Sequence, residues 1–154
     1  MPIAQFLALV LSALALVPAG AHLFALPNKI GLAQTDYFIV QNIYRGWALF
    51  GIVLFGALAA TLVLAVLVRR QRAPFLLTIA SFVCQAVTLA LFFAFVYPAN
   101  VATNNWTVIP DNWEALRWQW EAGHAVDAGI TFIGFCALVL GVVLSRSESA
   151  LPHR

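Results

Sequence analysis

Six ionisable side chains stand out because they lie within or beside stretches that are otherwise apolar, all toward the same end of those stretches. They are His22, Arg45, Arg117, Glu121, His124 and Asp127. A charge at membrane depth is costly unless it is paired or lies in a polar cavity. Such residues therefore mark a candidate functional site, and their types suit acid–base catalysis, the binding of oxygen atoms, or metal ligation.

Four of these residues are spaced to share one face of a helix. Glu121, His124 and Asp127 follow Arg117 at steps of three and four residues. At about 100° per residue, this spacing confines the side chains to an arc of roughly 120°. Arg117 and His124 are each within contact range of Glu121 on such a helix. A face this polar cannot face lipid, so we expect it to face other helices.

Three interpretations of the site are structural or require a metal or haem. One is an ion-pair network that locks the helix ends together. A second is a metal site, because Glu121-x-x-His124 has the spacing that di-iron bundles use. A third is haem held by His22 and His124. The Glu-x-x-His motif occurs once and two separate histidines are a weak signal, so we expect no cofactor, with haem or iron at His22, Glu121 and His124 as the alternative.

The fourth interpretation is a substrate site without a cofactor. We expect His124 to act as general base, with Glu121 or Asp127 fixing its tautomer. Two arginines would hold oxygen atoms of the substrate, and tryptophans would form walls for a flat apolar molecule. The expected substrate-binding residues are Arg45, Arg117, His22, Asn42, Trp113 and Trp120.

The composition places the site in an integral membrane protein. Of the 154 residues, 63% are hydrophobic and 9% are charged, whereas soluble domains have about 25% charged residues. The length suits a single domain covering residues 1–154. The net charge of +2 is too small to indicate nucleic acid as a partner.

Four apolar runs are long enough for the roughly 20 residues that a bilayer requires. They cover about residues 3–25, 42–68, 74–97 and 113–144. The sequence therefore predicts an all-α fold, an integral membrane four-helix bundle.

The arginines set the expected orientation of the bundle. Arg69, Arg70 and Arg72 lie between the second and third runs, and Arg146 and Arg154 lie in the tail. Because positive residues favour the cytoplasmic side, we expect both termini in the cytoplasm and the chain in a cell inner membrane. All five tryptophans then fall at or near the outer side, which favours an aromatic-lined outer chamber. They are Trp47, Trp106, Trp113, Trp118 and Trp120.

Several short motifs resemble those of the anthrone-oxygenase-like family, small four-helix membrane proteins that include a bacterial domain of unknown function. The motifs are Leu26-Pro27-Asn28-Lys29, Gln41-Asn42-Ile43-Tyr44-Arg45-Gly46-Trp47, Pro98-Ala99-Asn100, Asn112-Trp113 through Arg117 to Trp120-Glu121, and His124-Ala125. The resemblance covers nearly the whole chain. It implies a fungal-type relative that oxidises an anthrone to an anthraquinone with molecular oxygen and no evident cofactor.

These observations predict a membrane-embedded oxygenase or related oxidoreductase. Its substrate would be a lipophilic, aromatic small molecule bound in a polar pocket near the outer leaflet, and membrane lipids would be its other partner. The alternative is a non-enzymatic accessory subunit or small-molecule binding module whose ion pairs are structural. The sequence leaves open whether the chain works alone, as a homo-oligomer, or within a larger membrane complex.

Overall fold

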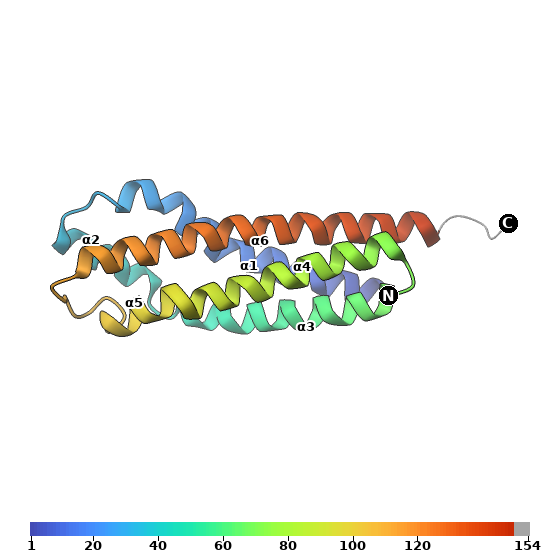
Figure 1. The fold of residues 1–154 in the computed structure, drawn as a ribbon, viewed down its shortest axis with the longest axis horizontal. Helices are drawn as coiled ribbons and strands as arrows, with labels where there is room; N and C mark the ends of the chain where they lie inside the picture. The colour runs from blue at the N-terminus through green and yellow to red at the C-terminus, as the bar shows by residue number, and fades with distance from the viewer. Residues whose placement is uncertain (150–154) are drawn as a thin grey trace.

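Four long helices lie side by side along the molecule in the computed structural model, which describes residues 1–149 (Figure 1). They are α1 (Pro2–Lys29), α3 (Phe50–Val68), α4 (Arg72–Leu91) and α6 (Trp113–Ser149). Four helical segments are long and apolar enough to cross a membrane. The predicted all-α fold with four long apolar helices is confirmed.

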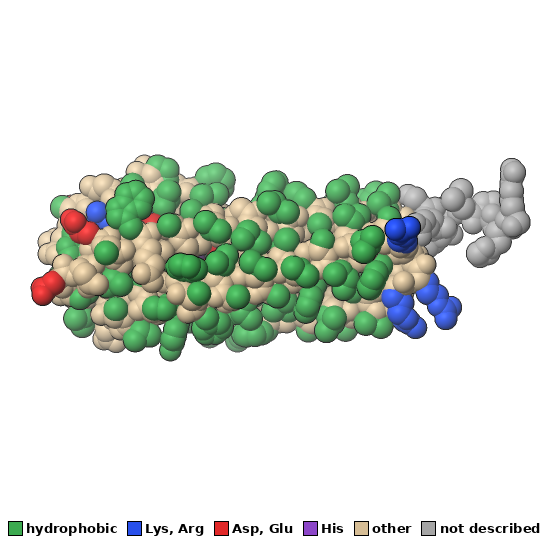
Figure 2. Space-filling view, in the orientation of Figure 1, with side chains coloured by type: hydrophobic (Ala, Val, Ile, Leu, Met, Phe, Trp, Pro, Cys, Tyr) green, Lys and Arg blue, Asp and Glu red, His purple; other side chains and the backbone are tan. Residues whose placement is uncertain are grey.

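One end of the bundle carries short elements, and we call it the cap end. Those elements are α2 (Gln34–Gln41), η1 (Asn42–Tyr44), η2 (Trp47–Leu49) and α5 (Tyr97–Ala102). The opposite end, where α3 turns into α4, exposes Arg69, Arg70 and Arg72, and we call it the arginine end. Hydrophobic side chains cover the face between the two ends (Figure 2).

Two helix limits differ from the sequence prediction in ways that shape the site. The first helix continues to Lys29, past its expected end at residue 25, with Pro27 inside it. Proline there lacks the N–H that would donate to the carbonyl one turn back, so the helix continues with this one backbone hydrogen bond missing. The second span does not begin as one helix at residue 42. Gly46 has a φ of 84°, which breaks the chain into η1 and η2 before α3 begins.

Glycines on α6 allow this helix to pack closely against α4. A Cβ atom on Gly134 would lie 2.7 Å from Cβ of Cys84, and one on Gly141 would lie 3.3 Å from the carbonyl oxygen of Pro74. Toward the cap end, a Cβ on Gly123 would lie 3.0 Å from Cγ2 of Val96, within the π-helical segment η3 (Phe92–Val96). Small residues let membrane helices approach this closely, so the glycines fix the position of α6.

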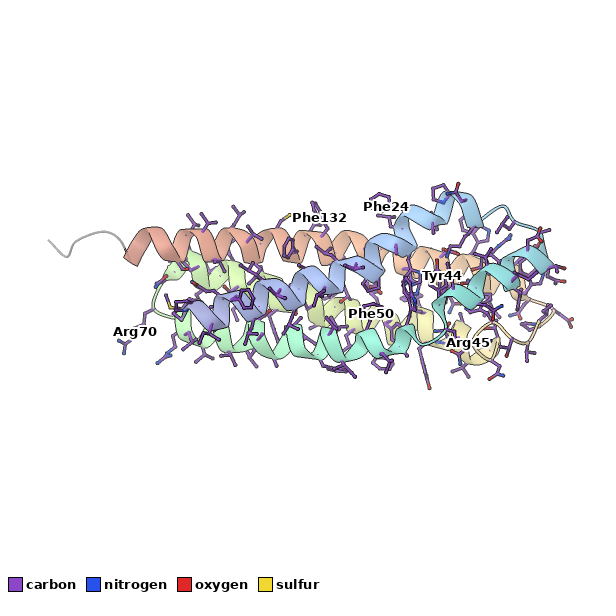
Figure 3. All side chains as sticks on the ribbon, turned by 180° about the vertical axis from the view of Figure 1, so that it is seen from behind. Phe24, Tyr44, Arg45, Phe50, Arg70 and Phe132 are labelled. Atoms are coloured by element: carbon purple, nitrogen blue, oxygen red, sulfur yellow. The ribbon has the colours of Figure 1, made fainter. Side chains whose placement is uncertain are left out.

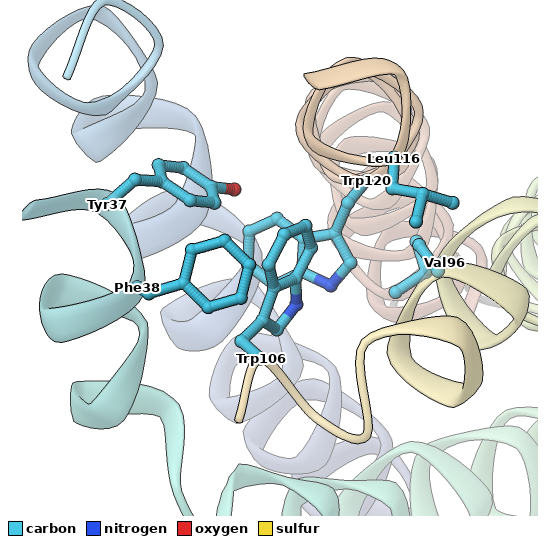
Figure 4. Close-up of a cluster of buried hydrophobic side chains, with 7 residues drawn as sticks. Tyr37, Phe38, Val96, Trp106, Leu116 and Trp120 are labelled. Carbon is cyan, nitrogen blue, oxygen red and sulfur yellow. The ribbon is translucent and has the colours of Figure 1, made fainter. Parts of the chain in front are cut away.

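The buried hydrophobic side chains form two clusters. The cluster toward the arginine end consists of Ala8, Leu64, Val68, Leu138 and Val142. The cap-end cluster is mainly aromatic and consists of Tyr37, Phe38, Val96, Ala99, Trp106, Leu116 and Trp120 (Figure 4). The candidate site lies beside this second cluster.

Candidate functional site

Two imidazole rings stack on each other in the cap-end half of the bundle. His22 comes from α1 and His124 from α6, with ring centroids 3.9 Å apart and ring planes 11° from parallel. His22 is buried and His124 is half-buried. The structure thus brings together two histidines that lie a hundred residues apart in the sequence.

Three aromatic side chains surround the histidine pair. The rings of Tyr44 and Trp47 lie 4.3 Å and 5.4 Å from His22, and Trp120 contacts both imidazoles, at 4.9 Å and 4.3 Å. Figure 3 shows Tyr44 on the segment that leads into α3. The histidine pair is therefore enclosed by flat apolar surfaces.

Asn100 holds Trp120 in this position. Its side-chain oxygen accepts hydrogen bonds from the indole nitrogens of both Trp106 and Trp120, at 3.2 Å and 2.9 Å. The two indole rings meet edge to face at 5.8 Å (Figure 4). Trp106 itself has a φ of 63°, a conformation that is unusual for a bulky residue. The backbone nitrogen of Trp106 donates a hydrogen bond to the hydroxyl of Thr103, which helps to hold Trp106 in this conformation.

A buried ion pair adjoins the aromatic walls. Lys29 Nζ lies 3.0 Å from Glu121 Oε1, and both side chains are almost fully buried. The Tyr37 hydroxyl donates a hydrogen bond to the same carboxylate oxygen over 3.0 Å, and the Gln41 side-chain amide donates a hydrogen bond to the Tyr37 hydroxyl. This network joins α1, α2 and α6. It gives Glu121 a cationic partner that the sequence analysis had not assigned.

Lys29 also lies over two aromatic rings. Its ammonium nitrogen is 4.5 Å from the centroid of Tyr44 and 4.8 Å from that of Trp120. Such cation–π contacts partly replace the water that burial removes from the ammonium group. Lys29 thus links the ion pair to the rings around the histidines.

Arg117 is buried and forms no ion pair with Glu121 within the described residues. Its guanidinium donates to the backbone oxygen of Leu32 over 2.9 Å and lies over the ring of Trp113, 4.6 Å from its centroid. Arg117 therefore fastens the turn after α1 onto α6. This contact uses one of the two arginines that we expected to bind substrate oxygen atoms.

The structure does not place Arg45 and Asn42 with the other candidate residues. Both are exposed, and Arg45 donates a hydrogen bond to the Asn42 side chain over 3.1 Å. The turn at Gly46 explains this placement, because Tyr44 and Trp47 on either side of it both contact His22 while Arg45 is exposed. The expected convergence of all six ionisable residues is therefore wrong for Arg45.

Asp127 lies one helical turn deeper than His124. Its side chain is buried, and its Oδ1 atom has no hydrogen-bond partner among the described residues. Neither Asp127 nor Glu121 bonds to His124 in the part of the chain that the structure describes, so the expected carboxylate support for the His124 tautomer is not seen.

Deeper still, Gln85 closes the polar region. Its amide nitrogen lies within 3.3 Å of hydroxyl oxygens on three helices, those of Ser12, Thr61 and Ser81. Thr88, one turn away, donates to the backbone oxygen of Gln85.

Several buried polar atoms near the histidine pair have no hydrogen-bond partner within residues 1–149. They are His22 Nδ1, Tyr44 OH, Arg117 Nε, Glu121 Oε2 and Asp127 Oδ1. Buried polar atoms are hydrogen-bonded in the great majority of cases. Each exception costs about 1–3 kcal/mol. Gln41, Gln71 and Gln85 each carry one such atom as well, the last two outside the site.

The hydroxyl groups of the buried Tyr37 and the half-buried Tyr44 stay protonated well above neutral pH. Burial raises the pKa of Tyr44 to about 12, and the nearby Glu121 carboxylate acts in the same direction. Burial also raises the pKa of Tyr37 far above its ordinary value, again with help from Glu121. Both phenols are therefore hydrogen-bond donors at neutral pH.

The geometry also bears on the alternative of haem or iron. No three His, Cys, Asp or Glu side chains gather as possible metal ligands within the described residues. The rings of His22 and His124 contact each other face to face, so haem ligation by both would require them to move apart.

The sequence analysis placed Trp47 in the aromatic-lined outer chamber but gave Lys29, Tyr37 and Tyr44 no role in the site. A signal for Lys29 was available. It is the only lysine in the chain and follows His22 by seven residues, which places both on one helix face. For the two tyrosines, the sequence carries no comparable signal.

Comparisons with protein-family models, curated proteins and solved structures found no match to this chain. The resemblance to the anthrone-oxygenase-like family therefore stays a prediction from its motifs.

Proposed function

We propose that this chain is a multi-pass protein of a cell inner membrane, with both termini in the cytoplasm and the cap end outside. The four long apolar helices and the exposed hydrophobic side chains between the two ends support insertion. The exposed Arg69, Arg70 and Arg72 at one end support the orientation.

Within the membrane, we propose that the protein is an oxygenase-like oxidoreductase acting on a lipophilic, aromatic small molecule. The observation that carries this proposal is the stacked His22–His124 pair, enclosed by aromatic rings and set beside buried polar atoms without partners. Flat walls suit a flat substrate, and an imidazole within hydrogen-bond reach of a substrate proton can act as a general base.

The residues divide the chemistry between them. The histidine pair removes a proton from an activated C–H group of the substrate, and His22 Nδ1 is free of other hydrogen bonds within the described chain. The Lys29 ammonium group, and not the arginines first expected, stabilises the oxyanion that forms on the substrate. Glu121 holds Lys29 in place.

Molecular oxygen would serve as the oxidant, as the family resemblance implies. For an anthrone, the ring CH₂ group loses its two hydrogen atoms and gains one oxygen atom as a carbonyl. The second oxygen atom leaves as water with both hydrogens. This balance needs no further reductant, in keeping with a site built from side chains.

Anthrone turnover by the protein in lipid vesicles tests the proposal. We expect oxygen consumption and anthraquinone formation with the wild type, and a loss of at least about a hundredfold in His124→Ala, the usual scale of a missing general base. Trp118→Phe, at an exposed position on the same helix, is the matched control. Full turnover by a folded His124→Ala protein would contradict the assignment.

A second function is supported by a specific contact, the Lys29–Glu121–Tyr37–Gln41 network that joins three elements. This network would suit an accessory subunit or binding module in which the ion pair is structural. Glu121→Gln would then lower thermal stability in detergent without altering any reaction. A Glu121→Gln protein that stays stable but loses anthrone binding would argue against this function.

A further inference from the structure

Tyr44 places a phenol ring of the protein itself against the histidine pair. Its ring lies 4.3 Å from His22 at an angle of 37°, and the Lys29 ammonium lies 4.5 Å from its centroid. The rings of Trp47 and Trp120 flank it, at 4.9 Å and 5.5 Å. The surroundings of Tyr44 are therefore those expected around a flat ligand.

The hydroxyl group of Tyr44 makes no hydrogen bond in the described chain, although it is buried. The Glu121 carboxylate is close enough to act on it electrostatically, and Glu121 Oε2 is itself without a partner within residues 1–149. The Tyr44 side chain can therefore move out of the site without breaking a side-chain hydrogen bond. A ligand hydroxyl placed closer to Glu121 Oε2 could form one with it.

The backbone around Tyr44 suits such a movement. Tyr44 ends the three-residue helix η1, and Gly46, two residues later, has a φ of 84°. The side chains on either side of it, Ile43 and Arg45, are exposed. Between Asn42 and Gly46, the Tyr44 ring is therefore the side chain that packs into the bundle, and Trp47 packs on His22 beyond the turn.

We propose that the site binds a neutral phenolic ring in the place of the Tyr44 ring, which swings outward to admit it. This inference rests on the proposed function and narrows its substrate from aromatic to hydroxyaromatic molecules. The ligand ring would stack on His22 and Trp120, and its hydroxyl would donate to Glu121 Oε2.

The charges at the site favour a neutral phenol over other ligands. Lys29 is already paired with Glu121, so a ligand that enters as an anion would have to share this one cation with the Glu121 carboxylate. A plain hydrocarbon would leave Glu121 Oε2 and His22 Nδ1 without partners, which is costly in a buried site. A phenol satisfies the first of these atoms and keeps the ring contacts.

The test removes the internal phenol and offers a replacement. Tyr44→Ala should open a cavity that p-cresol fills, as small aromatic molecules fill engineered cavities. Toluene has the same shape without the hydroxyl. We expect p-cresol to raise the Tm of detergent-solubilised Tyr44→Ala by about 3 °C or more, with toluene giving less than half of this.

Two controls separate a specific site from partition into detergent. Tyr97→Ala removes an exposed tyrosine, and Tyr44→Phe keeps the ring in place. Neither variant should respond to p-cresol more than the wild type does. An equal effect of toluene and p-cresol on Tyr44→Ala, or an equal response of Tyr97→Ala, would overturn the proposal.

Hydrogen–deuterium exchange on the wild type keeps the proposal testable if Tyr44→Ala does not fold. Addition of 2-naphthol should speed exchange of the amides in residues 42–49, and naphthalene should not. No change with 2-naphthol would overturn the proposed displacement of Tyr44. Both measurements report binding and not turnover. A phenol site without anthrone oxidation would therefore refute the enzyme while leaving this inference intact.

Discussion

The two halves of the bundle solve the problem of burial in different ways. In the half toward the arginine end, Leu64 and Leu138 fill the core, Gln5 donates to Ser145 over 2.8 Å, and Thr78 donates to the backbone of Pro74, although Gln71 Oε1 has no partner within residues 1–149. In the cap-end half, an ion pair and two imidazoles replace the aliphatic core, and several polar atoms have no partner among the described residues.

This difference teaches where stability and function reside. Packing of apolar groups and small residues holds membrane helices together, and the arginine-end half offers both. Unsatisfied polar groups weaken a structure but can serve a reaction or a ligand. We therefore expect substitutions in the cap-end half to alter function and stability together, and substitutions near the arginine end to alter stability alone.

The largest expected loss of stability comes from removing the cation of the buried ion pair in the cap-end half. Lys29→Met leaves the Glu121 carboxylate, only 1% exposed, without its cation. Loss of one partner from a buried ion pair costs about 3–5 kcal/mol. Denaturation in mixed micelles, followed by circular dichroism, measures this loss of unfolding free energy.

The double variant Lys29→Met/Glu121→Met serves as the control for that experiment. Apolar replacement of a whole buried pair is often neutral or stabilising, so we expect most of the lost stability to return while any activity stays lost. A cost below about 1 kcal/mol for Lys29→Met alone, the size typical of exposed pairs, would show that the pair is hydrated.

A second substitution tests the other half through its closest helix contact. Gly134→Ala brings a methyl group to 2.7 Å from Cβ of Cys84, and overpacking of this kind costs about 2 kcal/mol. Gly129, on the same helix, has nothing within 4 Å of an added Cβ. Gly129→Ala should therefore be neutral or slightly stabilising. Equal thermal stabilities for the two variants would mean that α4 and α6 are not packed this closely.

The sequence was sufficient to predict the elements of the bundle because apolar runs and helical spacing are local properties. The polar face of α6 follows directly from the three- and four-residue steps between Arg117 and Asp127. Its inward orientation follows from the cost of exposing charge to lipid. The buried positions of Glu121 and Asp127 agree with this reasoning.

The partners of these residues could not be predicted in the same way. Glu121 pairs with Lys29 only because α1 continues to Lys29, about one turn beyond its expected end at residue 25. Arg45 lies outside only because Gly46 adopts a positive φ. Each outcome depends on a local backbone choice that tertiary packing decides, and composition carries no information about it.

A matched pair of tyrosines sharpens the comparison within the cap-end half. Tyr37→Phe removes a hydroxyl that donates to Glu121 and accepts from Gln41, so we expect a loss of about 1.5 kcal/mol. Tyr44→Phe removes a hydroxyl that is buried without a hydrogen bond in the described structure, so it should cause no loss and can raise stability by up to about 1–3 kcal/mol. Equal losses would show that Tyr44 is hydrogen-bonded after all, which would also weaken its proposed displacement.

The smallest expected effect concerns alkaline pH and the same tyrosine. Burial raises the pKa of Tyr44 to about 12 in the folded protein, whereas an unfolded tyrosine titrates near 10. Above pH 10 the unfolded chain releases this proton and the folded chain keeps it, so the stabilising contribution is complete below pH 10 and falls as pH rises toward 12. Thermal unfolding between pH 9 and about pH 11.5 should therefore show a steeper fall in Tm for the wild type than for Tyr44→Phe. Parallel curves would place the Tyr44 hydroxyl in water, at the exposed edge of the site and not inside it.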